Sequence, residues 1–366
     1  MIVLSLIAFV AAALAAGFVV RWVRSHAAVY GEGMPQRFHL GDVPRLGGAA
    51  VLLGLVASWA LGAALAWQGN LLWKGQYAWV GCWLLVLLPA AVGGIAEDVT
   101  QRLSVRYRLA MTAASGALAV LALDLAVSRT GIGWADLLLA HAPWLGLVIA
   151  LLAVAGLPHA FNIIDGYNGL AGMVALIVCL ALAHVALQVG DRTLAALLVT
   201  TAAATAGFLV WNYPRGMLFA GDGGAYIWGV VIATASVSLV QRNAEVSPWF
   251  PMLLLIYPVW ETVFSIYRKV ARGGSPGVAD ALHFHQLIYR RIVRGVFHDD
   301  ESRRVLMRNN RTSPYLWGFT LLTVVPAVLL WSNTPWLMAF CALFVVSYVA
   351  AYLAIVRFKV PHWLRR

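Results

Sequence analysis

The chain has 366 residues, of which 62% are hydrophobic and only 11% are charged, and its mean hydropathy is +0.81. Soluble domains carry about 25% charged residues, so this composition excludes a soluble globular protein and predicts an integral membrane protein. The three cysteines, Cys82, Cys179 and Cys341, lie within apolar runs without paired spacing, which predicts neither a disulfide framework nor a zinc site.

Apolar runs long enough to form membrane-spanning helices recur along the chain. The first run has no basic region before it and is followed by Arg21 and Arg24, so we expect a retained helix and not a cleaved signal peptide. The predicted spans are 2–20, 47–67, 79–96, 109–127, 143–161, 169–188, 193–211, 224–240, 249–267, 315–331 and 336–356. These make about 11 transmembrane helices, or 10 if Pro158 and His159 interrupt the fifth.

The predicted fold is therefore an all-α integral membrane protein. No internal repeat or soluble second domain is visible, so residues 1–366 are expected to form one polytopic domain, with 268–314 as its longest segment outside the membrane.

Lysine and arginine are concentrated in alternate connections between these spans. One set of connections and the C-terminal tail together hold 22 of the 26 basic residues, and the positive-inside rule places that set in the cytoplasm. The N-terminus is then periplasmic and the C-terminus cytoplasmic, in a bacterial inner membrane. The net charge of +11 is thus a topology signal, with anionic membrane lipids as a secondary partner and no nucleic-acid partner.

Acidic residues follow three different spans on the predicted cytoplasmic side. Glu97 and Asp98 end the third span, Asp165 follows the fifth, and Asp222 follows the seventh. Carboxylates at membrane depth are costly and usually functional. The sequence therefore predicts a single site at the cytoplasmic boundary.

The stretch FNIIDGYNGL, residues 161–170, carries three polar side chains at intervals of three: Asn162, Asp165 and Asn168. Residues three apart share a helix face, so these groups are expected to converge. A carboxylate flanked by carboxamides suits a hard cation or a sugar-phosphate. The alternative is an ordinary polar loop with a helix N-cap.

The other acidic motifs also have two interpretations each. Glu97 and Asp98 would act as a base or face a cation, or would form a solvated helix-end pair beside neighbouring arginines. Asp222, flanked by glycines in FAGDGGAY, suits a metal-phosphate site, although an aspartate before an apolar run also caps helices well. Phe219 would stack on a base or anchor the chain at the membrane interface.

Basic and histidine residues supply candidate anion contacts. His283 and His285 stand near Arg290 in the long segment, and such donors fit a pyrophosphate better than a zinc site. A basic segment at the lipid surface is the alternative for this region. Arg45, just before the second span, could contact an anionic group, whereas Glu261 is expected to be a structural polar residue.

Taken together, these motifs resemble the polyprenyl-phosphate N-acetylhexosamine-1-phosphate transferases, the WecA/MraY superfamily, in its WecA-like branch. Five motifs occur in the family's order over residues 35–291: H-x-G-D-x-P-R-L-G-G, an acidic pair, N-x-x-D-G-x-N-G-L-A, F-x-G-D-G-G and D-x-x-H-x-H. The resemblance implies transfer of a sugar-1-phosphate from a UDP-amino sugar to undecaprenyl phosphate with release of UMP, the initiating step of a cell-surface polysaccharide such as O-antigen. It also implies Mg²⁺, or Mn²⁺, as the cofactor, and the frequent dimers of this family leave a homodimer open.

The resemblance assigns a role to each motif. Asp222 and Asn162 would be metal ligands. The predicted catalytic residues are Glu97, Asp98, Asp165, His283 and His285. The predicted substrate-binding residues are Arg45, Asn168, Phe219 and Arg290, with Phe219 at a uracil-stacking position.

Several positions depart from the commoner family pattern. Glu97 stands where aspartate is usual, His159 replaces an asparagine, and Asn168 replaces a common aspartate. Ala281 and Gln286 interrupt the histidine motif. These changes leave the exact donor sugar open among GlcNAc, GalNAc and 6-deoxy amino sugars.

Two other classes of protein share part of this pattern. A secondary transporter would also have many spans and intramembrane acids, but its site is expected near the membrane midplane between repeated halves. A lipid-bound scaffold protein would not need convergent carboxylates.

Overall fold

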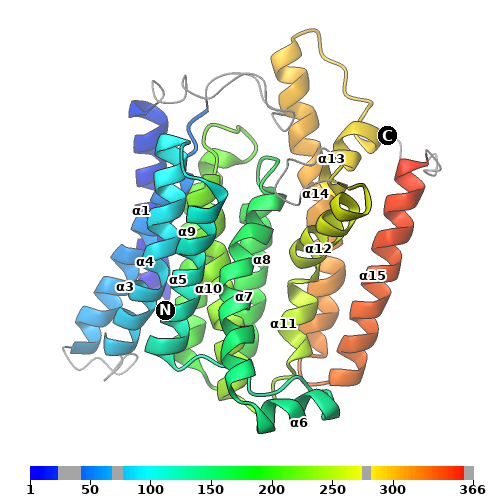
Figure 1. Cartoon of the computed structure of the whole chain (residues 1–366). Coiled ribbons are helices and arrows are strands. Elements are labelled where there is room, and N and C mark those ends of the chain that lie inside the picture. The colour runs from blue at the N-terminus through cyan, green and yellow to red at the C-terminus, as the bar shows by residue number, and fades with distance from the viewer. Residues whose placement is uncertain (24–42, 68–76, 274–281, 358–366) are drawn as a thin grey trace.

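A computed structural model describes residues 1–23, 43–67, 77–273 and 282–357, and every regular element in this part of the chain is a helix. The helices are α1 (Ile2–Trp22), α3 (Gly47–Trp67), α4 (Tyr77–Thr100), α5 (Val105–Leu123), α6 (Gly133–His141), α7 (Trp144–Ile164), α8 (Leu170–Gln188), α9 (Arg192–Asn212), α10 (Gly221–Arg242), α11 (Trp249–Leu254), α12 (Ile256–Ala271), α13 (Phe284–Leu287), the π-helix η1 (Ile288–Ile292), α14 (Glu301–Leu329) and α15 (Thr334–Val356). The long helices lie side by side in one bundle, and the short α6 lies across one end of it (Figure 1).

Nine helices in the described ranges are long and apolar enough to cross a membrane. They are α1, α3, α4, α7, α8, α9, α10, α14 and α15. This confirms an all-α membrane protein, because only structures that satisfy their backbone hydrogen bonds internally are stable in lipid. The two other predicted spans correspond to α5 and to the pair α11 and α12, so the count of eleven stays a prediction.

The predicted ninth span, 249–267, was expected to be one helix and is two. Pro258 lacks an N–H group, and its ring would clash with the carbonyl of Leu254, four residues earlier in a continuous helix. The helix accordingly ends at Leu254 and restarts at Ile256. Pro158 has no such effect, and α7 continues through it to Ile164.

Helix α10 is the centre of the bundle and is almost completely buried. It contacts α3, α4, α5, α7, α8 and α9. Glycines allow the closest of these approaches: a Cβ atom on Gly48 of α3 would overlap the backbone of Gly223 and Gly224, and one on Gly94 of α4 would lie 2.7 Å from Gly223. The first turn of α10 is therefore packed backbone to backbone against two neighbouring helices.

Candidate active site

Asp222, in the first turn of α10, accepts hydrogen bonds from three other side chains. Asn162, in the last turn of α7, donates through Nδ2 to Asp222 Oδ1 at 2.7 Å. The Arg108 guanidinium donates to Oδ2 at 2.7 Å, and the Tyr226 hydroxyl donates to the same oxygen at 3.2 Å. The two predicted metal ligands, Asp222 and Asn162, are thus in direct contact although 60 residues separate them.

Asp98 holds the start of α10. Its carboxylate is 4% exposed and accepts hydrogen bonds from the backbone N–H groups of Asp222 and Gly223, each at 2.8 Å. These N–H groups have no partner within the helix, and the positive end of the helix dipole favours a carboxylate there. The alternative that Asp222 itself caps this helix is wrong, because Asp98 of α4 satisfies these N–H groups.

Glu97 stabilises the turn between α4 and α5. Its Oε2 accepts a hydrogen bond from the backbone N–H of Leu103 at 2.8 Å. That turn leads into α5, from which Arg108 reaches Asp222. The two adjacent acids therefore have different local partners, and the catalytic role predicted for them stays a prediction.

Asp165 follows the last residue of α7 and is partly exposed. Loss of hydration raises the pKa of its carboxyl to about 7, while the positive charge of Arg45 opposes this rise. The negative charge of Asp222 raises the pKa further, and a backbone hydrogen bond from Gly221 lowers it. These interactions bring Asp165 and Arg45 into the same charged cluster as Asp222.

The segment before α3 is joined to the segment before α10 by backbone hydrogen bonds. Phe219 N–H donates to the Pro44 carbonyl, and Gly47 N–H donates to the Phe219 carbonyl, both at 2.9 Å. This pairing fixes Phe219, whose side chain is half-buried, and Arg45 near the start of α10.

Gly221 lies between the backbone of the segment before α3 and the Asp98 carboxylate, and only glycine fits there. Its φ is +70°, a conformation that favours glycine. A Cβ atom there would also overlap the carbonyl oxygen of Arg45 and the carboxylate of Asp98. The groups that occupy the space beside this glycine are protein groups, and the metal-phosphate site expected from the glycines around Asp222 stays a prediction.

The two predicted histidines lie together beside the Asp165 turn. The rings of His283 and His285 are stacked, with centroids 5.3 Å apart and an interplanar angle of 5°, and both side chains are buried. A Cβ atom on Gly166 would lie 3.1 Å from His285 Nε2. The histidine motif therefore reaches the residue next to Asp165.

Asn168 does not converge with Asn162 and Asp165 as expected. Its backbone N–H donates to Asn309 Oδ1 at 2.8 Å, and its side chain donates to Asn310 Oδ1 at 2.9 Å. The Ser313 hydroxyl donates to the Asn168 carbonyl at 2.6 Å. Helix α7 ends at Ile164 and Asp165 already has a non-helical backbone (ψ 58°), so the helical path on which equal spacing would have aligned the three groups stops before Asn168.

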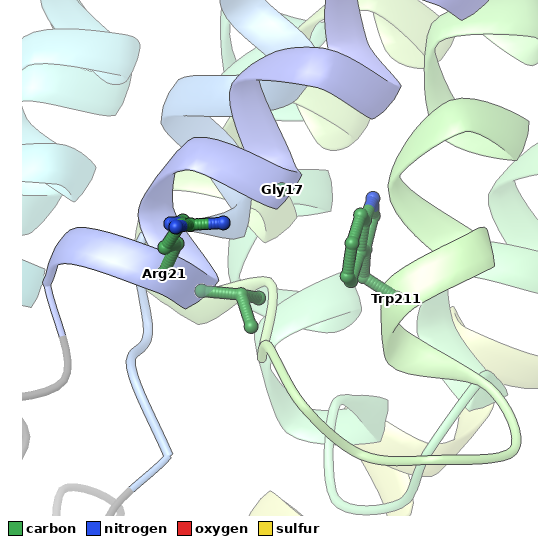
Figure 2. Close-up of a pocket in the computed structure, with 4 residues that line it drawn as sticks. Gly17, Arg21 and Trp211 are labelled. Atoms are coloured by element: carbon green, nitrogen blue, oxygen red, sulfur yellow. The ribbon is translucent and has the colours of Figure 1, made fainter.

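The remaining predicted features are Arg290, whose positive charge acts on Tyr167 beside His285, and residues outside the described ranges. Arg290 is half-buried in η1. The first half of the N-terminal motif, at 39–42, and Ala281 fall outside the described residues. A pocket of about 380 Å³ lies between α1 and α9, where Arg21 and Trp211 face it from opposite sides (Figure 2), and it contains none of the predicted site residues.

Two residues at the centre of the site, Arg108 and Tyr226, were not predicted to belong to it. Tyr226 follows Asp222 by four positions, and that spacing on one helix face would have indicated the contact. Arg108 was interpreted only as one of the arginines beside the solvated acidic pair. Its contact with Asp222 joins residues 114 positions apart, and such a contact leaves no local signal in the sequence.

The family model for glycosyl transferase family 4 matches residues 80–240, the range from α4 to α10 that carries the acidic pair, Asn162, Asp165 and Asp222. A protein of Bacillus subtilis described as a probable undecaprenyl-phosphate N-acetylglucosaminyl 1-phosphate transferase is 24% identical over 322 residues, which cover 86% of this chain and 80% of the relative.

Two further relatives match in the same way. The undecaprenyl-phosphate alpha-N-acetylglucosaminyl 1-phosphate transferase of Thermotoga maritima is 28% identical over 57% of this chain and 62% of its own length. The decaprenyl-phosphate N-acetylglucosaminephosphotransferase of Mycolicibacterium smegmatis is 27% identical over 75% of this chain and 72% of its own. The family match covers the helices that build the site, and together with these relatives it supports a WecA/MraY-type membrane enzyme.

Proposed function

We propose that this phosphoglycosyl transferase transfers N-acetylhexosamine-1-phosphate from a UDP-sugar to undecaprenyl phosphate. A phosphate oxygen of the lipid attacks the sugar-bearing phosphorus of the donor, the bond to the other phosphate breaks, and UMP leaves. The product is an undecaprenyl-diphospho-sugar. The relatives are named for N-acetylglucosaminyl 1-phosphate transfer to undecaprenyl or decaprenyl phosphate, which supports these substrates.

The observation that carries this proposal is the charged cluster around Asp222. Helix ends from α4, α5, α7 and α10 meet there, and they place Asn162, Arg108 and Asp98 within hydrogen-bonding distance of the Asp222 residue. These groups lie at one end of the bundle, where a water-soluble nucleotide and a lipid phosphate could both enter. A transporter would instead hold its site near the midplane.

The donor chemistry at Asp222 fits Mg²⁺. Asp222 and Asn162 offer hard oxygen atoms, and Mg²⁺ is commonly held by one or two carboxylates together with substrate phosphates. Within the described residues, no group of three or more His, Cys, Asp and Glu side chains is placed to hold a metal by itself, so the substrate would supply further ligands. When bound, the ion would neutralise charge on the pyrophosphate.

The protein's own residues would bind the anionic substrates, fix the Asp222 turn and accept a proton. Arg108 and Arg45 would attract the two anionic substrates to the same end of the bundle. Asp98 would keep the Asp222 turn fixed through the α10 N–H groups. Asp165, with a pKa raised to about 7, would accept the proton of a singly ionised lipid phosphate and so increase its nucleophilicity.

Placement in the cell follows from the distribution of basic residues. The connections predicted to be cytoplasmic and the C-terminal tail hold 22 of the 26 Lys and Arg residues, and Arg45 and Arg108 from these connections lie at the site, which favours a cytoplasmic active site in the bacterial inner membrane. The reaction would initiate assembly of a cell-surface polysaccharide. Contacts with anionic lipids and pairing into a homodimer are part of this proposal.

The test is UMP release by the purified full chain from a panel of UDP-amino sugars, with undecaprenyl phosphate and Mg²⁺. We expect turnover on one donor, lost with EDTA and in Asp222→Ala. Asp299→Asn, which removes an exposed carboxylate from the segment before α14, is the control and should retain full activity. Folded protein that releases no UMP from any donor would overturn the proposal.

A further inference from the structure

Glu261 is a buried carboxylate outside the charged cluster of Asp222. It lies on α12, is 0% exposed, and was expected from sequence to have only a structural role. We infer that Glu261 is a positioning residue that, together with Tyr348, holds the His283–His285 pair against the Asp165 turn. This inference rests on the proposed function, since it concerns how that reaction's site is assembled.

The hydrogen-bond partners of Glu261 come mainly from the histidine motif. His283 Nδ1 lies 3.0 Å from Oε1. The backbone N–H of Phe284 donates to the carboxylate, at 3.2 and 3.3 Å from its two oxygens. The Tyr348 hydroxyl, from α15, donates to Oε2 at 2.7 Å. One carboxylate therefore joins α12, the start of α13 and α15.

The bond to Glu261 favours one protonation of the His283 ring, whose side chain also accepts a hydrogen bond from the backbone N–H of Gln286. An ionised carboxylate is only an acceptor, so His283 Nδ1 is the protonated donor in the bond to Glu261. A neutral His283 with its proton on Nδ1 has an unprotonated Nε2, which is a hydrogen-bond acceptor. A carboxylate that orients a histidine in this way is a recurrent second partner of functional imidazoles.

The opposite side of the histidine pair is held by stacked rings. Tyr167 packs edge-on against His285, with centroids 5.6 Å apart, and Tyr289 stacks on Tyr167 at 5.3 Å. The Arg308 guanidinium lies over Tyr289 at 4.3 Å. The histidine pair thus lies between Glu261 and these stacked side chains. His285 packs closely against Gly166, the residue after Asp165.

A buried carboxylate is expensive, and a fold that needed only packing could use an apolar residue of similar volume there. Besides the Tyr348 hydroxyl, His283 Nδ1 and the Phe284 N–H donate to this charge, and they reach it only in this arrangement of the histidine motif. Glu261 thereby couples the arrangement of His283 and His285 to helices α12 and α15, which contribute no other residue to the predicted site.

The test uses Glu261→Gln and Tyr348→Phe, which keep side-chain size and remove the charge or the hydroxyl. Tyr257→Phe is the matched control, because it deletes a buried hydroxyl one turn away on α12 that has no hydrogen-bond partner within the described part of the chain. UMP release is measured as kcat and KM for the UDP-sugar, per unit of folded protein, alongside the melting temperature. The same is done for His283→Ala and the Glu261→Gln/His283→Ala double variant.

We expect Glu261→Gln to lower kcat/KM by about 10- to 100-fold, Tyr348→Phe to lower it less, and Glu261→Asp to restore part of the loss. Tyr257→Phe should be unchanged. The double variant should be no worse than His283→Ala alone, because Glu261 acts through His283.

Two results would overturn the inference while leaving the proposed function intact. One is an active parent enzyme in which Glu261→Gln lowers only the melting temperature, with kcat/KM per folded molecule unchanged. The other is a double variant whose loss is the product of the two single losses. An inactive parent enzyme would instead contradict the proposed function.

Discussion

Asp165 carries a carboxyl whose surroundings shift its ionisation toward neutral pH. Its carboxyl has a pKa raised to about 7, so it is protonated below that value and available as a base above it. We expect kcat to rise as pH increases through about 7 and the rise to disappear in Asp165→Asn. A lipid phosphate titrates in a similar range, so the diagnostic measurement is the difference between the two pH profiles. Identical profiles would exclude Asp165 as the base.

Arg108 provides a second prediction for a single residue. Its bond of 2.7 Å to Asp222 places a permanent positive charge where two anionic substrates would meet. We expect Arg108→Ala to lower kcat/KM for the UDP-sugar by about 100-fold or more, a typical loss when one preorganised donor is removed. Arg102→Ala, which changes an exposed arginine just before the same helix, is the control. Equal losses in both variants would indicate a general effect of surface charge.

Among the elements, the packing of α3 against α10 depends on glycine. A Cβ atom on Gly48 would overlap the backbone of Gly223 and Gly224. Backbone atoms, unlike a side chain, cannot avoid this overlap by changing rotamer. Gly48→Ala should therefore separate the two helices and destabilise the fold by about 1–3 kcal/mol, with loss of UMP release because the Asp222 turn moves. Thermal unfolding in detergent measures the first effect.

Gly81→Ala is the matched control for this packing. Gly81 is also in a long helix, α4, but nothing lies within 4 Å of a Cβ built there. The same change should be neutral or slightly stabilising, because alanine favours helix by about 1 kcal/mol over glycine. If both variants unfolded at the same temperature as the parent, α3 and α10 would not need this close approach.

For the whole molecule, the sequence was sufficient to predict an all-helical membrane protein and the gathering of Asp98, Asp165 and Asp222 at one site, because both depend on composition and local pattern. Contacts between distant segments left no such signal. Asp98 looked like a member of a reactive pair, yet it caps α10, 124 residues away. Asn168 looked aligned with Asp165, yet α7 ends at Ile164 and Asn168 bonds to Asn309 of α14. Glu261 could be recognised as buried, but its link to His283 depends on tertiary packing.

The orientation of the bundle in the membrane yields the last prediction. Phe297 is 89% exposed at the site end, just before α14, and Trp134 is 72% exposed on α6 at the opposite end. If the basic connections are cytoplasmic, a membrane-impermeant thiol reagent added to intact cells should label Trp134→Cys and not Phe297→Cys. Permeabilised cells should show both labels. The parent chain is the background control, because Cys179 and Cys341 are buried and Cys82 is partly buried.

The reverse pattern would place the Asp222 cluster on the outer face. A cytoplasmic nucleotide sugar could not reach it there, so this labelling tests the proposed reaction as well as the topology. The two conclusions are linked because the arginines that determine orientation include Arg45 and Arg108, which also line the charged cluster. We therefore expect the positive charges that hold this end of the bundle in the cytoplasm to serve also in attracting its anionic substrates.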